Sequence, residues 1–425
     1  MNFNRRNFIR TAGILSALSL KEIDVLAAKR QMAASDKTVA DDDESYWSNV
    51  RRLFPLTREL TYMNNGTYGP SPYPVIEATH EGMMMADQDG VYGNYDGTPP
   101  KLAQFVGANA DEIALTHNVT EGINIACCGV PLKKGDEVIL TTHEHVGNAL
   151  PWMNRIKLHG IVIRKFTPAA TAEETLSRIA ALINRKTRVI ACPHIPCTQG
   201  QVLPVKEICA LARKHNLFSL IDGAHGPGMI PLDLHDMGCD TYAGCCHKWM
   251  LGPKGTGFLY IRKDFQNTLI PYHVGAGSDD GKWDIMTEPV TINEYAASAH
   301  RYYGGTQANG LYAGVNAAVD FLQGIGMDNI HRRVKSLGKY TQDSLLGFGD
   351  KIQLLTPTEE RSRCAINGFI IKGVESKKFF DLCMQNKVRI RCVPENGLNS
   401  LRVSTHIYNN REDVDRLMEM IKKNI

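Results

Sequence analysis

The sequence predicts an α/β protein with a mostly parallel, doubly wound sheet and a smaller α+β domain at the C-terminus. Between residues 111 and 261, short apolar runs bounded by turn residues alternate with longer helical stretches, which is typical of βαβ units. Polar residues directly follow several of these runs, at the strand ends of the predicted sheet. Ligands of a parallel sheet bind in the crevice beside these strand ends. From about residue 308 the pattern becomes helical and then mixed, which indicates a second domain.

The predicted elements follow one another at the spacing that a doubly wound sheet needs. Strands are expected over 111–115, 136–141, 162–166, 187–192, 217–221, 241–246 and 258–261, with helices over 75–86, 172–184 and 205–216. The C-terminal part is expected to contain helices over 313–322, 331–346 and 411–423 and strands over 369–371, 388–391 and 400–404. We therefore place a large domain at 47–305 and a small domain at 306–425, with segment 47–75 a candidate to pack on the small domain.

The first 34 residues have the form of an export signal with its linker. The pair Arg5-Arg6 precedes a short apolar stretch from Ala12 to Leu20, and paired arginines before such a stretch are typical of the twin-arginine route. The stretch is shorter than the roughly 20 residues that a membrane-spanning helix needs. An amphipathic N-terminal helix is the alternative. We predict export by the twin-arginine route to the periplasm, without a membrane span.

The composition argues against several classes of function. The first 30 residues carry a net charge of +4, so the rest of the chain, at −1, is close to neutral. This balance argues against nucleic acid or an anionic membrane surface as the main partner. The 11 cysteines form neither a disulfide framework nor a Cys/His cluster with metal-binding spacing. We expect them to be buried as small apolar side chains, and we expect no metal site.

Two charged residues at predicted strand ends suggest a cofactor. Asp222 follows the apolar run 217–221, and Lys248 follows the run 241–246. In a crevice at the strand ends, a lysine amine can form a Schiff base with pyridoxal phosphate (PLP). A carboxylate there can keep the pyridine nitrogen protonated, so that the ring accepts electrons. For these two residues alone, a surface lysine and a helix-capping aspartate are the simpler alternative.

Two segments rich in asparagine and glycine are candidates for contacts with a ligand. After the run 111–115, residues 116–124 lead into a helix, whose N-terminus offers free N–H groups to an anion such as phosphate. Thr120 can bond a phosphate, although an N-cap is the commoner role for Thr120 and Asn118. The turn Met63-Asn64-Asn65-Gly66 permits close approach of the backbone to a ligand, or forms a tight turn before the next helix.

Taken in order, these motifs resemble the class V aminotransferase family of fold-type I PLP enzymes. The likeness extends from about residue 50 to the C-terminus and involves several separated motifs, which makes it more specific than a single motif. Within the family, the segments 63–66 and Thr198-Gln199-Gly200 are most similar to the isopenicillin N epimerase-like branch. The resemblance implies a fold-type I transferase with a seven-stranded-type sheet and PLP as its cofactor.

The resemblance also implies roles for individual residues. Lys248 would carry PLP, Asp222 would bond the ring nitrogen, and His145 would stack on the ring, so that these three are the expected catalytic residues. The residues implied to bind the cofactor are Thr120, Glu121, His145, Asp222, His225, His247, Lys248 and Thr306, and those implied to bind the substrate are Asn65, Gly66 and Arg402. In this family the pair Gly305-Thr306 often comes from the neighbouring subunit, which implies a homodimer with shared active sites.

Departures from the family pattern bear on the reaction. Val119 stands where relatives often have a second threonine, and Cys197 lies near where many desulfurases carry asparagine. The loop after Arg391 lacks the insertion that supplies the persulfide-forming cysteine of desulfurases, and Cys392 is too close to the strand end to replace it. The expected function is PLP-dependent chemistry at Cα or Cβ of an amino acid or amine. The alternatives are a cysteine desulfurase or C–S lyase acting by β-elimination, and a catalytically idle exported binding protein on the same fold.

Overall fold

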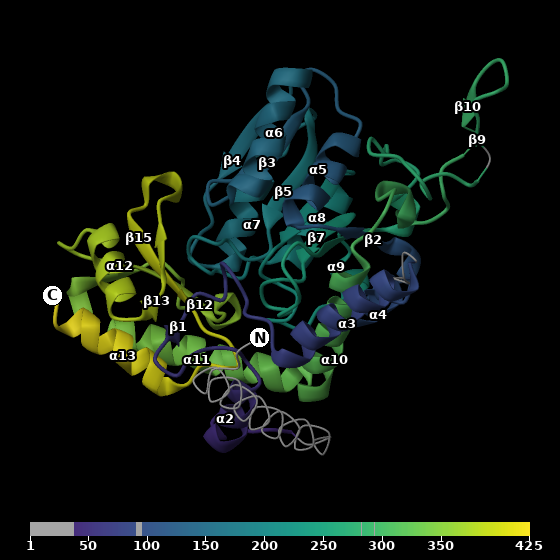
Figure 1. Cartoon of the computed structure of the whole chain (residues 1–425). Coiled ribbons are helices and arrows are strands. Elements are labelled where there is room, and N and C mark those ends of the chain that lie inside the picture. Colours follow the sequence, from purple (N-terminus) through teal and green to yellow (C-terminus); the bar gives the residue numbers. More distant parts are fainter. Residues whose placement is uncertain (1–37, 91–95, 282, 293) are drawn as a thin grey trace, which may run out of the picture.

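The computed structural model describes residues 38–90, 96–281, 283–292 and 294–425. The predicted export signal, including Arg5 and Arg6, lies outside these residues. The described chain forms a large domain around one sheet and a smaller domain around the C-terminal sheet (Figure 1). Two successive helices, α10 (Asn309–Ile325) and α11 (Met327–Leu346), lead from the large domain to the small one. Helix α10 packs along α3 (Tyr73–Asp89).

A seven-stranded sheet forms the centre of the large domain, with the strand order β2-β8-β7-β6-β5-β3-β4. Its strands are β2 (Ile113–Thr116), β3 (Glu137–Thr141), β4 (Val162–Phe166), β5 (Thr187–Pro193), β6 (Phe218–Gly223), β7 (Thr241–Cys245) and β8 (Gly257–Ile261). Strand β8 is antiparallel to β2 and β7, and the other neighbouring pairs are parallel. The prediction of a mostly parallel sheet is confirmed, and each predicted strand is present with small shifts at its ends.

Helices cover both faces of this sheet because its strands bury side chains on both sides. Val138, Leu140 and Leu220 belong to one apolar core with α5 (Val119–Gly129) and α6 (Val146–His159). Ile139 and Ile221 belong to another with α7 (Ala172–Ala180) and α8 (Val205–Lys214). The alternation follows the two-residue period of a strand. Burial on both faces explains why these strands appear in the sequence as continuous apolar runs.

Helix α7 is shorter than the predicted helix over 172–184. It ends at Ala180 because the next residues form a turn before β5. In that turn the N–H of Asn184 donates to Oγ1 of Thr187 at 3.0 Å, and the N–H of Thr187 donates to the carbonyl oxygen of Asn184 at the same distance. These local hydrogen bonds compete with the continuation of the helix.

The small domain is built on an antiparallel sheet of order β11-β12-β15-β14. Its elements are β11 (Ile352–Leu354), β12 (Ile366–Ile371), β14 (Arg391–Val393), β15 (Ser400–Ser404), α12 (Ser376–Gln385) and α13 (Arg411–Lys422). Leu401 and Val403 of β15 share an apolar core with Val414 and Leu417 of α13. Alternate residues of β15 face the other way, which directs Arg402 toward the large domain.

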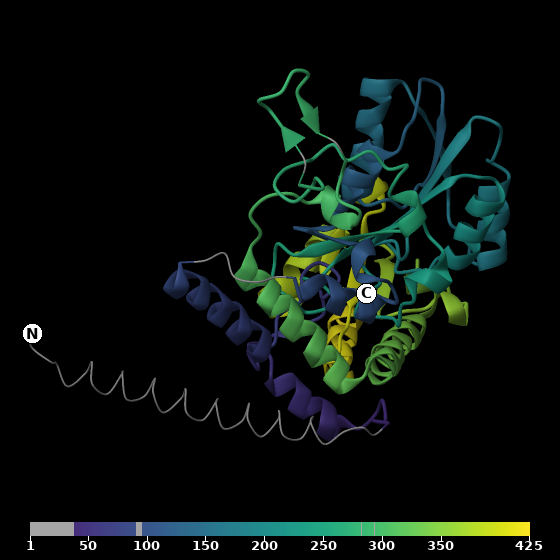
Figure 2. The same ribbon diagram turned by 90° about the vertical axis from the view of Figure 1, so that its right-hand side faces the viewer.

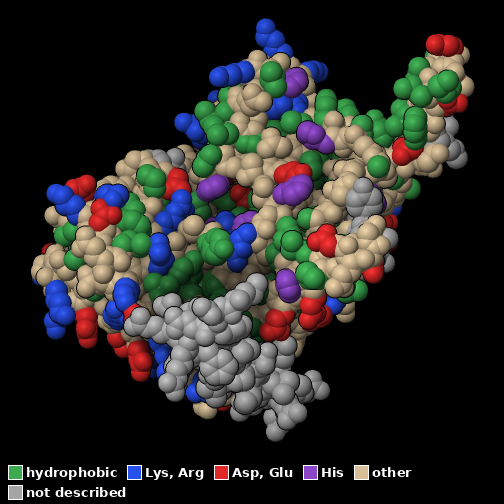
Figure 3. Space-filling view, viewed as in Figure 1, with side chains coloured by type: hydrophobic (Ala, Val, Ile, Leu, Met, Phe, Trp, Pro, Cys, Tyr) green, Lys and Arg blue, Asp and Glu red, His purple; other side chains and the backbone are tan. Residues whose placement is uncertain are grey.

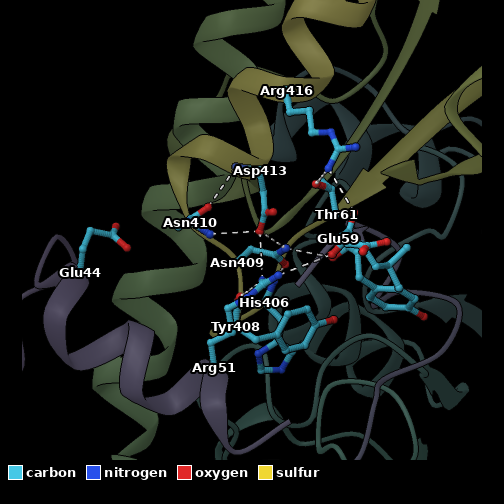
Figure 4. Close-up of polar contacts among 12 residues, drawn as sticks. Glu44, Arg51, Glu59, Thr61, His406, Tyr408, Asn409, Asn410, Asp413 and Arg416 are labelled. Carbon is cyan, nitrogen blue, oxygen red and sulfur yellow. Dashed lines mark hydrogen bonds and ion pairs between the residues drawn. The ribbon is translucent and has the colours of Figure 1, made fainter. Parts of the chain in front are cut away.

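The chain before α3 lies against the small domain (Figure 4). Arg51 of α2 (Glu44–Arg52) donates to the carbonyl oxygen of Tyr408 at 2.6 Å. The two-residue strand β1 (Thr61–Tyr62) pairs in parallel with β13 (Val388–Arg389). The next residues continue along the small domain, where Asn64 forms a parallel bridge with Ser404 at the end of β15. The turn that follows β1 is therefore held beside Arg402.

The other α-helices and strands of the described residues are short. They are α4 (Thr98–Val106), α9 (Leu234–Met237) and a hairpin of β9 (Trp283–Asp284) and β10 (Thr291–Ile292). The hairpin projects away from the body of the molecule in both ribbon views (Figures 1 and 2). Across the described ranges, no helix is both long enough and apolar enough to cross a membrane.

Candidate active site

A pocket of about 240 Å³ lies where the two domains meet, at the carboxyl ends of β6 and β7. Asp222 lies at the end of β6, and Lys248 lies in the loop after β7. Because these strands are parallel, with Asp222 opposite Ala243, both residues reach the same edge of the sheet. Histidine side chains gather around this hollow in Figure 3. The pocket is lined by Gly66, Thr67, Asn118, Val119, Thr120, His145, Gly147, Cys197, Asp222, Ala224, His225, Cys245, His247, Lys248, Arg391 and Arg402.

Asp222 is a buried carboxylate at the base of the pocket, with 4% of its surface exposed. Burial raises its pKa, and the N–H of Ala224, which donates to Oδ1 at 2.9 Å, and the Lys248 ammonium act in the opposite direction. A buried anion is stabilised when a cation pairs with it. The protonated ring nitrogen of PLP is such a cation, so Asp222 fits the pyridine end of the cofactor.

Glu144 provides a second buried acid close to Asp222. Burial raises its pKa well above the usual value, and the charge of Asp222 adds to this effect. Asn148 donates to Oε2 of Glu144 at 2.8 Å. The charge of Asp222 therefore disfavours ionisation of Glu144.

His225 also faces the pocket. Its Nδ1 accepts a hydrogen bond from Nε1 of Trp249 at 3.0 Å. Its Nε2 is buried and has no hydrogen-bond partner among the described residues. Because buried polar atoms are normally paired, this atom fits a ligand oxygen, and the ring oxygen of PLP suits it.

His145 and His247 contribute two further imidazoles to the pocket. His145 is the N-cap of α6, and its Nδ1 accepts from the N–H of Gly147 at 3.0 Å. Burial and the nearby Lys248 lower the pKa of His145, which keeps the ring neutral. Nδ1 of His247 lies 3.1 Å from the carbonyl oxygen of Thr256, and burial lowers the pKa of His247 as well.

The N-terminus of α5 forms the anion-binding end of the pocket. Asn118 is the N-cap, with its side chain accepting from the N–H of Glu121 at 2.9 Å. Asn118, Val119 and Thr120 all line the pocket. The first turn of a helix offers N–H groups without partners inside the helix, so this end fits the phosphate of PLP.

The structure does not bring the side chain of Glu121 to this pocket. Successive helical residues are rotated by about 100°, which turns Glu121 away from the side on which Thr120 lies. Its carboxylate accepts from the N–H of His117 at 2.5 Å and lies 2.9 Å from Nδ1 of the same residue. Glu121, which was predicted to bind the cofactor, directs its carboxylate to His117 and does not line this pocket.

Arg402 lies across the pocket from the sheet and is fully buried. Its guanidinium donates to Oγ1 of Thr67 at 2.7 Å, to Oδ1 of Asn64 at 3.2 Å and to the carbonyl oxygen of Cys197 at 3.0 Å. Burial lowers its pKa to about 10. These contacts fix the guanidinium plane at the pocket, which suits the grip of a substrate carboxylate.

The two other predicted substrate residues behave differently from each other. A Cβ added to Gly66 would lie 3.3 Å from the guanidinium of Arg402, so glycine allows the turn to approach that side chain. Asn65 lies outside the pocket, and its Oδ1 accepts from the hydroxyl of Tyr408 at 3.0 Å. Its neighbour Asn64 contacts Arg402 instead. The chain is extended at the bridge to β15, so the side chains of successive residues point to opposite sides.

Two of the pocket residues that were missed from the sequence lie beside Arg402. Thr67 bonds Arg402, and Arg391 lies opposite Arg402 on the neighbouring strand β14. Arg391 also pairs with Glu395, which lies nearby in the following turn. The pairing of β14 with β15 would have indicated Arg391, but no local pattern reveals that register.

Thr306 lies elsewhere in the chain. It lines a second pocket with Gly304, Gln307 and residues of β2, α5 and the 273–274 region, and does not line the pocket around Lys248. Within the described ranges, no group of three His, Cys, Asp or Glu side chains is arranged to hold a metal ion.

The fold and this pocket together define a fold-type I enzyme that uses pyridoxal phosphate. The family model described as Aminotransferase class-V matches residues 78–417. The chain therefore belongs to the class V aminotransferase family.

The relatives of this chain include enzymes of two groups. The chain is 29% identical over 393 residues to isopenicillin N epimerase of Amycolatopsis lactamdurans, covering 89% of this chain and 98% of that protein. It is 26% identical over 406 residues to a probable cysteine desulfurase of Halalkalibacterium halodurans, covering 88% and 97%. Among solved structures, a lysine-to-alanine mutant of C-DES with glycine covalently linked to its PLP cofactor matches with a TM-score of 0.79 and 25% identity, covering 87% of this chain and 98% of that one.

Proposed function

We propose that the protein removes the Cα proton of an amino acid and returns a proton to the same carbon, in the manner of isopenicillin N epimerase. The observation that carries the proposal is that Lys248, Asp222 and Arg402 line one pocket. The likeness to the epimerase of Amycolatopsis lactamdurans supports this reaction. A β-elimination of the C–S lyase type is the second candidate, favoured by the structural likeness to C-DES.

Each of the three residues has a distinct task. PLP, when bound, supplies the electron sink for the charge that develops at Cα. Arg402 holds the substrate carboxylate and so orients the Cα–H bond. The Nζ amine of Lys248 takes the proton from Cα as a general base. Asp222 would supply the negative charge at the ring nitrogen, and the neutral imidazole of His145 would lie against the ring. A proton delivered from solvent to the opposite side of Cα inverts the amino acid, and the proton taken up by Lys248 passes to solvent.

The cysteines argue against a desulfurase. A persulfide-forming cysteine reacts as the thiolate, which needs a lowered pKa and access. Cys197 and Cys245 line the pocket, but burial raises the pKa of both thiols, that of Cys245 to about 11. Cys392 lies on β14, outside the pocket lining, and burial raises its pKa as well. The chemistry of these thiols therefore favours a reaction that needs no sulfur acceptor.

The reaction is tested by following a panel of α-amino acids in D₂O. We expect inverted amino acid that carries deuterium at Cα, detected by chiral chromatography and mass spectrometry. Amines that lack the α-carboxylate should react at least about tenfold more slowly, because the buried Arg402 loses its charged partner. Pyruvate would instead indicate β-elimination, and a keto acid would indicate transamination. A PLP-loaded protein that exchanges no Cα proton in the whole panel would contradict the proposal.

We infer a homodimer in which Thr306 of each subunit completes the phosphate site of the other. Two observations support this arrangement. Thr306 does not line the Lys248 pocket of its own chain. In addition, α3 exposes Ile76, Met83, Met84 and Met85, an apolar surface of the kind that association covers.

Co-expression of two inactive variants tests the shared site. Lys248→Ala removes the lysine, and Thr306→Asp places a negative charge against the phosphate. In a mixed dimer with shared sites, one of the two sites has both wild-type residues, so random pairing restores about a quarter of wild-type activity. Sites contained in one chain would give no restoration beyond the residual activity of Thr306→Asp alone. A monomer in size-exclusion chromatography would also contradict the inference.

A further inference from the structure

We propose that Trp249 is a positioning residue that fixes the tautomer of His225, so that His225 presents an N–H group to the ring oxygen of PLP. Trp249 follows Lys248 directly in the chain and is fully buried. Its Nε1–H donates a hydrogen bond to Nδ1 of His225 at 3.0 Å. The proposal rests on PLP being the cofactor and adds a residue in contact with neither the substrate nor the reacting atoms.

The tautomer follows from the chemistry of the two side chains. An indole nitrogen can only donate, so Nδ1 of His225 offers its lone pair. Burial lowers the pKa of His225 well below its usual value, and the positive charges of Lys248, Arg402 and Arg391 and the ring of His145 act in the same direction. The imidazole is therefore neutral, and its one proton lies on Nε2.

This proton has no acceptor in the described protein. Nε2 of His225 is buried without a hydrogen-bond partner there, and His225 lines the pocket at whose base Asp222 lies. An N–H donor in that place stabilises an anionic ring oxygen, whereas the opposite tautomer would direct a lone pair at it. The indole N–H of Trp249 therefore decides whether His225 attracts or repels the ring oxygen.

The small domain holds the indole ring in place. Trp249 stacks on His406 with ring centroids 5.4 Å apart, and His406 stacks on Tyr408 at 5.7 Å, two residues labelled in Figure 4. Nδ1 of His406 accepts from the N–H of Ile407 at 2.7 Å. Its Nε2 therefore carries the proton and donates to the carbonyl oxygen of Trp249 at 3.0 Å. Because this loop directly follows β15, the strand that carries Arg402 also orients Trp249.

Histidine-selective ¹⁵N NMR of the full chain, before and after addition of PLP, reads the tautomer directly. We expect the Nε2–H form of His225 in the wild type and its loss or mixing in Trp249→Phe. The dissociation constant for PLP should rise about tenfold in that variant. Trp47→Phe is the matched control, because it removes a buried indole N–H that donates at 3.1 Å to the carbonyl oxygen of Ala40, and neither residue lines the pocket around Lys248. It should change neither the tautomer nor the affinity.

A double-mutant cycle separates positioning from packing. If Trp249 acts through His225, Trp249→Phe weakens PLP binding in the wild type but not in the His225→Ala background. Equal weakening in both backgrounds, or an unchanged tautomer in Trp249→Phe, would overturn the proposal. Replacement of Trp249 by 3-benzothienylalanine removes the N–H and keeps the ring shape. This variant provides the same test of PLP binding if Trp249→Phe disturbs folding. A wild type that takes up no PLP would contradict the family cofactor rather than the role of Trp249.

Discussion

Lys248→Ala should abolish turnover and the covalent attachment of PLP. The same amine attaches the cofactor and serves as the base at Cα, so its removal eliminates both functions. We expect kcat to fall by at least about 10⁴-fold, the upper range for loss of a positioned general base. The rate of Cα deuterium exchange measures the first effect. Borohydride reduction followed by mass spectrometry of the peptide containing residue 248 measures the second.

Lys254 provides a control for this experiment within the same loop. Burial lowers the pKa of its amine to about 8. A lysine with a lowered pKa is more reactive than an ordinary surface lysine. It donates to Oγ of Ser71 at 3.0 Å and does not line the pocket around Lys248. Lys254→Ala should keep both the yellow colour of the bound PLP and the borohydride labelling of Lys248. Label found on Lys254 in the wild type, or a colourless wild type that takes up no PLP, would contradict the assignment of Lys248.

Asp222→Ala should retain PLP and lose most of the activity. The loop lysine and the helix N-terminus of α5 still hold the cofactor, but the ring nitrogen loses the anion that keeps it protonated. We expect kcat to fall by about 10²–10³-fold, as for the loss of one preorganised electrostatic partner. Asp222→Asn, which keeps the shape and removes the charge, should fall by a similar factor. Steady-state kinetics together with the absorbance of the bound cofactor measure activity and retention separately.

The effect of the charge must be separated from that of burying a carboxylate. Asp240 is also a buried acid next to the same sheet, where its Oδ2 accepts from the N–H of Ser219 at 2.7 Å. Asp240→Asn should lower the thermal midpoint of unfolding and leave kcat close to that of the wild type. If Asp222→Asn has unchanged kinetics, or if Asp240→Asn loses as much activity, Asp222 does not have the proposed role.

Most of the fold could be predicted because its signals are local. Each strand of the large sheet is an apolar run between turn residues, and burial on both faces makes such runs continuous. Where the predicted end of a helix was wrong, a competing local hydrogen bond was the cause, as between Asn184 and Thr187, which end α7 early. The cofactor residues next to strand ends were predictable for the same reason. Asp222, His225 and Lys248 lie in short segments whose direction the sheet determines.

Contacts between distant segments could not be predicted in this way. Arg402 and Thr67 are separated by 335 positions, and Arg391 faces the pocket through its pairing with β15. Asn65 and Glu121 were assigned to the site from motifs, yet backbone geometry turns both side chains to other partners. A motif gives the neighbourhood of a residue, whereas the direction of its side chain depends on the turn or helix that carries it.

The sequence by itself determined the α/β class, the family and the cofactor, because strand periodicity and motif order are properties of neighbouring residues. Only the tertiary structure decided which side chains enter the pocket and which hydrogen bonds define their chemistry. The bond from Trp249 to His225 is the clearest case. It joins two ordinary residues 24 positions apart, and it exists because parallel strands β6 and β7 end at one edge and the small domain packs the indole against it.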